Sequence, residues 1–302
     1  MKKLNLVSLT AIVALGCVGA GAAEPTKIIP VGNRPESVTK GFGGRYYVTV
    51  MMGQEEGDGV IRVIDGDIAK DFATGMDEPK GIGFTGSHLV TTDVKKVWKV
   101  DQGGNKSLLA DEGSFPVPVS YLNDVAVAGG GRYVYVSDMG ANTKMFGPDG
   151  LWPPGSPEAK ALPAIGRIFR INMADGEVSV FVNNSVDWPT PNGITVRRDG
   201  TVYFVDFFTG NLMEKGRFQP KIIRTGFRGG DGIEFDPKGN LYISSWTRGQ
   251  VWLIEQNPTG HNPKVVISGL RSAADFYLDA PEKRLVIPDM IAGTIIYLPI
   301  EY

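Results

Sequence analysis

Short apolar alternations recur along this chain from about residue 26 onward. Each recurrence begins with a four-residue motif in which a polar residue stands beside proline, glycine or a small residue, and an apolar alternation follows. The six motifs are PESV at 35, PKGI at 79, LNDV at 122, PNGI at 191, GDGI at 230 and AADF at 273. Their starts are separated by 44, 43, 69, 39 and 43 residues, so the chain contains six copies of one unit.

Each unit contains several runs of strand-forming residues. The motif is followed by a turn and a β-branched or aromatic run, such as RYYVTV or NLYISS, and most copies add a third run, such as GVIRVID. A further run precedes each motif, as in AKDFATG and PKVVISG. Alternation with period two between Gly, Asp and Asn turns predicts strands rather than helices. Four strands in roughly 45 residues predict an all-β fold, a six-bladed β-propeller with four antiparallel strands per blade.

The two ends of the repeat region together supply the sixth blade. Only three strands follow Ala273, and the spare strand is the run from Thr26 to Gly32. An N-terminal strand that completes the C-terminal blade closes the ring and leaves no open sheet edge. We therefore expect a single propeller domain over residues 24–302.

Residues 1–23 have the order of a secretory signal peptide. Lys2 and Lys3 precede an apolar run from Leu4 to Gly16, and small residues lead to Ala23. The run is shorter than the ~20 residues of a membrane span, and no other segment is a candidate, so no span is expected. The prediction is an exported protein, periplasmic or extracellular, and an anchor helix or lipidation at Cys17 are the alternatives.

Cysteine content and net charge further limit the kind of protein and the partners it can have. Cys17 is the only cysteine, so the exported domain has no disulfide and must be stable through a large core. Without Lys2 and Lys3 the chain has 29 basic and 33 acidic residues, a formal charge of −4. This balance argues against nucleic acid as a partner, and the pattern identifies no protein partner.

The repeated motif also places polar residues at one level of the fold. In a propeller the first strand of each blade lines the central channel, so the polar residue of each motif should point into one mouth of it. In chain order the six residues are Glu36, Lys80, Asn123, Asn192, Asp231 and Ala274. Four of them carry oxygen donors, a set that suits one divalent cation, Ca²⁺ first, with Mn²⁺ or Mg²⁺ as alternatives. The absence of His and Cys argues against zinc or copper.

A simpler interpretation exists for single members of this set. Asn192-Gly193 and Asp231-Gly232 are ordinary turn dipeptides, and Glu36 alone is compatible with a solvated loop. The shared repeat position favours metal ligands.

At this point a family resemblance becomes specific. PESV, LNDV, PNGI with the following RRDGTVYFVD, and DGIEFDPKGNLYIS resemble the blade starts of the gluconolactonase/senescence-marker-protein (regucalcin-like) family, across residues 26–300. The resemblance implies a six-bladed propeller that hydrolyses sugar lactones. It also implies a single divalent cation held by Glu36, Asn192 and Asp231, with Asn123 beside the metal or the substrate. Related six-bladed propellers hydrolyse other esters or organophosphates.

Lys80 departs from that family pattern. A cation at this position is repelled by a nearby metal ion. Three interpretations stay open: Lys80 binds a carboxylate or phosphate of the substrate, loses its proton, or is a surface lysine with a buried stem. The only histidines, His88 and His261, lie in predicted turns or outer connections, which argues against a histidine dyad.

These residues suggest catalytic roles. Asp231, with Glu36 as the alternative, orients or deprotonates an attacking water. Asn123 holds a hydroxyl or the carbonyl oxygen of the substrate, and Lys80 counters developing charge. The predicted substrate is a small molecule, a lactone or related ester.

The extra length of the third unit predicts an insertion over residues 139–166, on the same face as the donor residues. Residues 51–59 and 184–191 are expected there too, so all three loops rim the channel mouth. Five apolar residues either form a wall of the substrate site or pin these loops to the blades: Met145, Phe146, Leu151, Trp152 and Trp188.

An aspartate also ends the second strand in four units. These residues are Asp93, Asp138, Asp206 and Asp289. We interpret them as caps of turns rather than as a metal ring, because they recur at strand ends.

The sequence thus favours a divalent-metal-dependent hydrolase of sugar lactones or related esters. The alternative is a non-catalytic propeller that binds a ligand or a protein, with a structural metal in the channel, because propellers host both kinds of function. A lyase or isomerase with the same cation ranks third, since no histidine base is evident.

Overall fold

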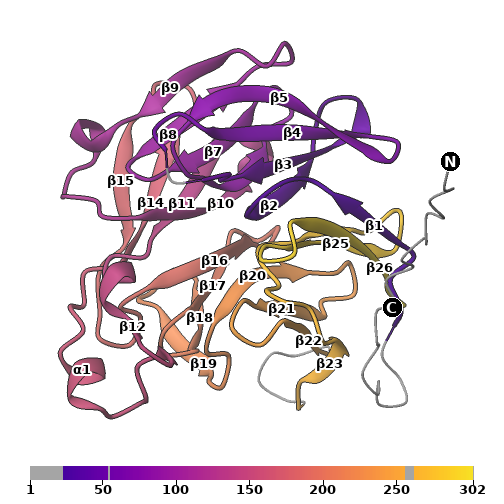
Figure 1. The fold of residues 1–302 in the computed structure, drawn as a ribbon. Coiled ribbons are helices and arrows are strands. Elements are labelled where there is room, and N and C mark those ends of the chain that lie inside the picture. The colour runs from indigo at the N-terminus through magenta and orange to yellow at the C-terminus, as the bar shows by residue number, and fades with distance from the viewer. Residues whose placement is uncertain (1–22, 54, 256–261, 302) are drawn as a thin grey trace, which may run out of the picture.

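The computed structural model describes residues 23–53, 55–255 and 262–301. Over these residues the chain forms six four-stranded sheets and one short two-stranded hairpin. The sheets are arranged around a common centre (Figure 1), so the predicted all-β, six-bladed propeller is confirmed. The predicted signal peptide, apart from Ala23, lies outside the described residues, and so do Cys17 and His261. No helix in the described ranges is long and apolar enough to cross a membrane.

Each blade has an inner, a second, a third and an outer strand, paired antiparallel. From the first blade to the sixth, the inner strands are β2 (Pro35–Lys40), β6 (Pro79–Phe84), β10 (Leu122–Ala128), β16 (Pro191–Val196), β20 (Gly230–Phe235) and β24 (Tyr277–Asp279). The second strands are β3 (Tyr46–Val50), β7 (Leu89–Asp93), β11 (Tyr133–Asp138), β17 (Val202–Asp206), β21 (Leu241–Ser245) and β25 (Arg284–Asp289). The third strands are β4 (Gly59–Asp65), β8 (Lys96–Val100), β14 (Arg167–Asn172), β18 (Leu212–Lys215), β22 (Gln250–Ile254) and β26 (Thr294–Pro299). The outer strands, at the periphery in Figure 1, are β5 (Ile68–Met76), β9 (Lys106–Ala110), β15 (Val178–Val182), β19 (Lys221–Arg224), β23 (Lys264–Ile267) and β1 (Lys27–Pro30).

The sixth blade joins the two ends of the domain, as expected from the spare N-terminal run. β1 pairs antiparallel with β26, from Lys27 opposite Tyr297 to Pro30 opposite Thr294. The inner strand β24 begins later than the AADF motif, because Ala273 forms only an isolated bridge with Asp289. The ring is closed by this mixed blade, and no blade is left with a missing strand.

The longest connection lies in the third blade, between β11 and β14, and we call residues 139–166 the lid. It contains a 3-10 turn, η4 (Asn142–Lys144), the hairpin β12 (Phe146–Gly147) and β13 (Gly150–Leu151), and the helix α1 (Pro157–Lys160). The Ser156 side chain accepts a hydrogen bond from Ala159 N, so α1 begins with an ordinary N-cap. The other 3-10 turns are η1 (Phe42–Gly44), η2 (Glu112–Ser114) and η3 (Gly129–Gly131). The lid therefore departs from the end of a second strand, on the face where the inner strands begin.

The core lies between neighbouring blades. Val48 of the first blade packs in one cluster with Ile29 and Val286 of the sixth, and all three are buried. Val90 and Val136 likewise join the second blade to the third. Each such side chain contributes about 1.5–3 kcal/mol when fully buried, so the ring is stabilised by six similar interfaces rather than by one central core.

Closure by β1 can be tested with two isoleucines on adjacent positions of that strand. Ile29 is 1% exposed in the cluster between the first and sixth blades, whereas Ile28 is 57% exposed on the other face. We expect Ile29→Ala to lower the free energy of unfolding by about 2–4 kcal/mol, because it leaves a cavity in the core. Ile28→Ala should change it by less than about 0.5 kcal/mol. Urea unfolding measures both, and equal effects of the two substitutions would refute a structural role for this strand.

Candidate functional site

Of the six residues at the repeated motif position, the five polar ones converge on one cavity at the channel mouth. A cavity of about 190 Å³ is lined by Glu36, Lys80, Asn123, Asn192 and Asp231, together with apolar residues considered below. Each of the five is at most 6% exposed. The sixth, Ala274, is buried and is not part of this wall. The prediction of a shared level is therefore confirmed for these five residues, whereas Ala274, expected at the same level, does not line the cavity.

A β-bulge at the start of each of the first five inner strands directs these side chains. In the first blade the register shifts between Pro35 and Val38, so that Glu36 lies in the irregular segment. The inner strands of the next four blades shift at the same point. A bulge leaves a residue unpaired and re-aims its side chain.

The inner strands also approach each other closely at this level. A Cβ on Gly193 would lie 1.8 Å from Asp231 O, so only glycine fits beside the next strand. The residue before this glycine, Asn192, is thereby brought next to Asp231.

The two asparagine amides are oriented by hydrogen bonds from their nitrogen atoms. Asn192 Nδ2 donates to Asp231 Oδ1 at 3.2 Å, and Asn123 Nδ2 donates to Met139 Sδ at 2.9 Å. Their carbonyl oxygens, Asn123 Oδ1 and Asn192 Oδ1, are buried and accept no hydrogen bond from the described residues. Glu36 Oε2 is likewise buried and accepts no hydrogen bond from the described residues. Buried acceptors without donors are rare in native proteins, and three of them at one channel level are suited to a cation.

Burial disfavours the charged forms of both carboxylates at this level. The pKa of Glu36 is raised well above its usual value, first by burial and then by Asp231, while Lys80 lowers it. The pKa of Asp231 is also raised well above its usual value, by burial and by the nearby Asp124. A positive charge between these groups would reverse the effect, because it favours the ionised forms.

The donor set fits a hard divalent cation. Among the described residues, no three His, Cys, Asp or Glu side chains are grouped closely enough to hold a metal ion. A cation here would therefore need the asparagine oxygens as well as Glu36 and Asp231. Carboxylate and amide oxygens are the ligands that Ca²⁺ takes, and Mg²⁺ or Mn²⁺ with retained waters is compatible with the same set.

Lys80 is buried, which excludes one of its three interpretations, the surface lysine. Its side chain is 1% exposed, and Nζ donates to Glu78 O at 3.0 Å and to Glu78 Oε2 at 3.2 Å. The ammonium also lies 4.0 Å from the centroid of the Tyr121 ring. Burial lowers the pKa of Lys80, and Glu78 and Glu36 oppose this effect. Glu78 and Tyr121 thus hold the Lys80 ammonium group within the protein.

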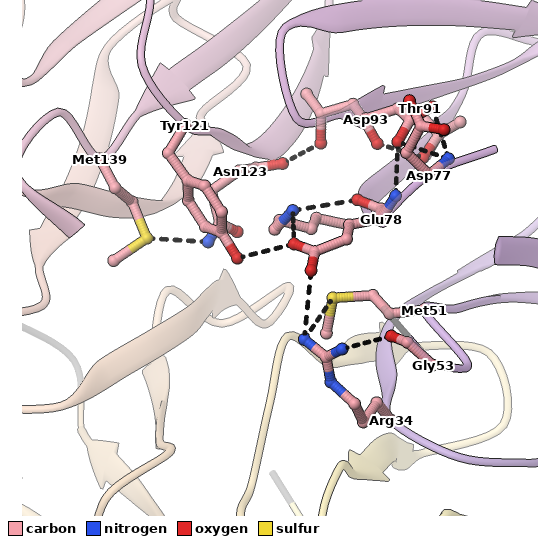
Figure 2. Close-up of polar contacts among 12 residues, drawn as sticks. Arg34, Met51, Gly53, Asp77, Glu78, Thr91, Asp93, Tyr121, Asn123 and Met139 are labelled. Atoms are coloured by element: carbon pink, nitrogen blue, oxygen red, sulfur yellow. Dashed lines mark hydrogen bonds and ion pairs between the residues drawn. The ribbon is translucent and has the colours of Figure 1, made fainter. Parts of the chain in front are cut away.

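Glu78 links Lys80 to two further polar residues, Arg34 and Tyr121. Figure 2 shows Glu78 between them: Arg34 Nη2 lies 3.7 Å from Glu78 Oε1, and Tyr121 Oη donates to Glu78 Oε2 at 3.3 Å. The sequence reasoning missed all three. A signal was present, because each stands two residues before a predicted site residue in its blade.

The sequence reasoning also missed an apolar ring around the cavity. In five blades the residue that directly follows the second strand lines the wall: Met51, Met139, Phe207, Trp246 and Met290. The corresponding residue in the second blade, Val94, does not line this cavity. We call the five residues the apolar ring. Its members share one repeat position, which the sequence could have shown.

The lid contributes some of the expected wall residues and not others. Met145 and Phe146 line the cavity. Leu151 and Trp152 pack against the apolar cluster beneath the lid, and Arg228 Nη2 donates to Trp152 O at 2.7 Å, so this part pins the loop. Trp188 is buried against Phe204 with ring centroids 6.0 Å apart and is blade core rather than wall.

The aspartates that end the second strands cap backbone amides. Tyr121 N donates to Asp138 Oδ1 at 2.8 Å, and Thr190 N donates to Asp206 Oδ2 at 2.6 Å. Asp93 and Asp289 accept equivalent bonds in their blades. Their predicted structural role is confirmed.

A second cavity of about 400 Å³ lies deeper along the inner strands and contains further carboxyl groups. Asp124 and Asp275 directly follow the motif residues Asn123 and Ala274, and Glu234 lies three residues after Asp231. Asp124 accepts Val125 N at 2.6 Å and Ile194 N at 2.5 Å. Burial raises the pKa of Asp124 to about 6 and that of Glu234 to about 7. The channel is therefore acidic over its length.

Comparison with known proteins shows the fold. No family model matches the chain, and no curated protein matches it significantly. The chain is similar to a solved structure described provisionally as a gluconolactonase, with a TM-score of 0.64 and 16% identity over 94% of this chain and 96% of that one. It is also similar to a gluconolactonase from Xanthomonas campestris, with a TM-score of 0.61 and 16% identity over 93% of this chain and all (100%) of that one. In total 957 solved chains match, so the fold alone selects no function.

The acidic channel should make stability depend on pH in a defined direction. The pKa of Glu234 is about 7 in the folded protein, above the ~4.3 of an unfolded chain. The folded state therefore binds more protons between these values, and this group's contribution to stability is lost as the pH rises through about 7. We expect Glu234→Gln to gain stability relative to the parent protein between about pH 5 and about pH 8, the range around its pKa of about 7.

Thermal unfolding with a chelator present measures this difference. Glu158→Gln, on the exposed surface of α1, is the control for loss of one charge. A difference between the Glu234 variant and the parent that stays constant over this range would contradict the assignment.

Proposed function

We propose that this propeller is a divalent-cation-dependent hydrolase of lactones or related esters. The observation that carries the proposal is the set of three buried oxygens without donors, on Glu36, Asn123 and Asn192, beside the Asp231 carboxylate. The two similar structures are described as gluconolactonases, which supports this substrate chemistry. The predicted export signal agrees with a periplasmic or extracellular site of action.

The cation would be held by Glu36, Asn123, Asn192 and Asp231. When bound, it would polarise the carbonyl group of the substrate and stabilise the negative charge that develops on the carbonyl oxygen.

Asp231 is assigned as the group that orients and deprotonates the attacking water. It lines the cavity, and the Asn192 amide holds its Oδ1 at 3.2 Å, which fixes the carboxylate plane. A general base of this kind typically contributes a factor of about 10²–10⁴ to the rate. Glu36 is less suited to this step, because its Oε2 accepts no hydrogen bond from the described residues that would orient the carboxylate.

Asn123 and Lys80 have different roles in this scheme. The contact between Asn123 Nδ2 and Met139 Sδ turns Asn123 Oδ1 toward the channel, where it can accept a hydroxyl of the substrate or bind the cation. Lys80 donates to Glu78 rather than to the cavity, so it supplies positive charge near Glu36 and no hydrogen bond to the substrate. The contacts with Glu78 favour this role over the interpretation in which Lys80 binds a carboxylate or phosphate of the substrate.

The first test is hydrolysis of a lactone panel by metal-stripped protein that is resupplied with Ca²⁺, Mn²⁺ or Mg²⁺. Activity should return with at least one cation, and Asp231→Ala should lower kcat/KM by at least about 100-fold. Asp149→Ala, an exposed carboxylate in the lid, is the matched control and should leave kcat/KM unchanged.

Calorimetry separates the outcomes. Cation binding that Asp231→Ala weakens, without hydrolysis of any lactone or ester, would refute the hydrolase and favour a ligand-binding propeller with a structural metal. Absence of cation binding would refute the metal site itself.

A further inference from the structure

The wall of the cavity differs in chemistry from its floor. The floor consists of the proposed cation ligands, whereas the wall consists largely of the apolar ring and of Met145 and Phe146 from the lid. Methionine side chains are flexible and polarisable, and aromatic faces pack well against apolar groups. A substrate that reaches the floor must therefore lie against sulfur, aromatic and methyl surfaces.

Apart from the side-chain amide of Asn142 in the lid, the polar donors on this wall are engaged within the protein. Trp246 Nε1 donates to Met290 Sδ at 2.9 Å, Asn123 Nδ2 to Met139 Sδ, and Arg34 Nη2 approaches Met51 Sδ at 3.6 Å. Tyr121 Oη donates to Glu78. Three sulfurs of the apolar ring thus accept donors of the wall, and the acceptors without donors lie on the floor, where the proposed cation would occupy them. Burying a hydroxyl without a partner is unfavourable.

The charges around the cavity are paired in the same way. Arg34 and Lys80 are the basic residues of the wall, and both face the Glu78 carboxylate. Arg34 Nη1 also donates to Gly53 O at 2.8 Å. With Glu36 and Asp231 on the floor, the described side chains of the cavity present no unpaired positive charge to an anionic substrate.

The geometry points to a neutral lactone or ester with an apolar alkyl or aryl group as the substrate, rather than a sugar lactone. This inference rests on the proposed hydrolase function and specifies its substrate class. The cavity of about 190 Å³ is below the ~300–1,000 Å³ of drug-sized sites, so the apolar group is small, such as a short chain or one aromatic ring.

The experiment compares lactones of one ring size with different substituents, in the presence of the cation that supports activity. Glucono-1,5-lactone is the hydroxylated member, and δ-octalactone is the alkyl member. We expect kcat/KM for the alkyl lactone to exceed that for the sugar lactone by at least about 30-fold, because several methylenes gain an apolar contact. A preference for the sugar lactone, with cation-dependent hydrolysis intact, would overturn the inference and leave the proposed function standing.

Two variants locate the selectivity in the apolar ring. Met51→Gln should reduce the ratio of the two kcat/KM values by at least about tenfold, because a polar amide replaces an apolar contact. Val94→Gln changes the equivalent residue of the second blade, which does not line the cavity, and should leave the ratio unchanged. Equal effects of both substitutions would show that selectivity does not arise from the wall.

A binding measurement tests the preference for an apolar substrate even if neither lactone is hydrolysed. The lactam counterparts of the two lactones resist hydrolysis, and calorimetry with the full protein measures their binding. Tighter binding of the alkyl lactam supports the apolar pocket, whereas tighter binding of the hydroxylated lactam, or binding of neither, overturns it.

Discussion

Six inner strands share one axis, and the site follows from this constraint. Each strand begins beside its neighbours, and in the first five blades it carries a bulge at the same point, so each of these blades presents one side chain at each level. Space at the axis is so limited that Gly193 tolerates no Cβ. Side chains that enter the channel are consequently removed from water, and carboxylates such as Glu36 and Asp231 are placed where only a cation or a proton can balance them.

The proposed cation ligands and the residues proposed to select the substrate occupy different positions of the same repeat. The proposed ligands lie in the bulge of the inner strand, and the apolar ring follows the second strand. A substitution in the ring can therefore alter which substituent is accepted while the oxygen donors keep their places. The two sets still touch, since the Asn123 amide donates to Met139. That contact lets a residue of the wall fix the orientation of a residue of the floor.

The repeat made much of the fold and part of the site predictable. Six copies of one alternation specified the blades, the mixed sixth blade and the convergence of Glu36, Asn123, Asn192 and Asp231, because equivalent positions in a ring are equivalent in space. A repeat position does not specify partners, however. The burial of Lys80 depends on Glu78 and Tyr121, which come from two blades. The place of Trp188 stayed open for a similar reason, since the sequence of a loop does not show which face of a blade its tryptophan covers.

The pairing of β1 with β26 sets the order in which the molecule can fold. Lys27 and Tyr297 are opposite one another in the sheet although almost the whole domain separates them in the chain. A contact of such high sequence separation forms slowly, since the entropy of loop closure opposes it until the intervening blades are compact. β1 must therefore wait until β26, which is synthesised later, is available for pairing. Until then both carry an unpaired strand edge, the state in which the chain is most prone to associate with other chains.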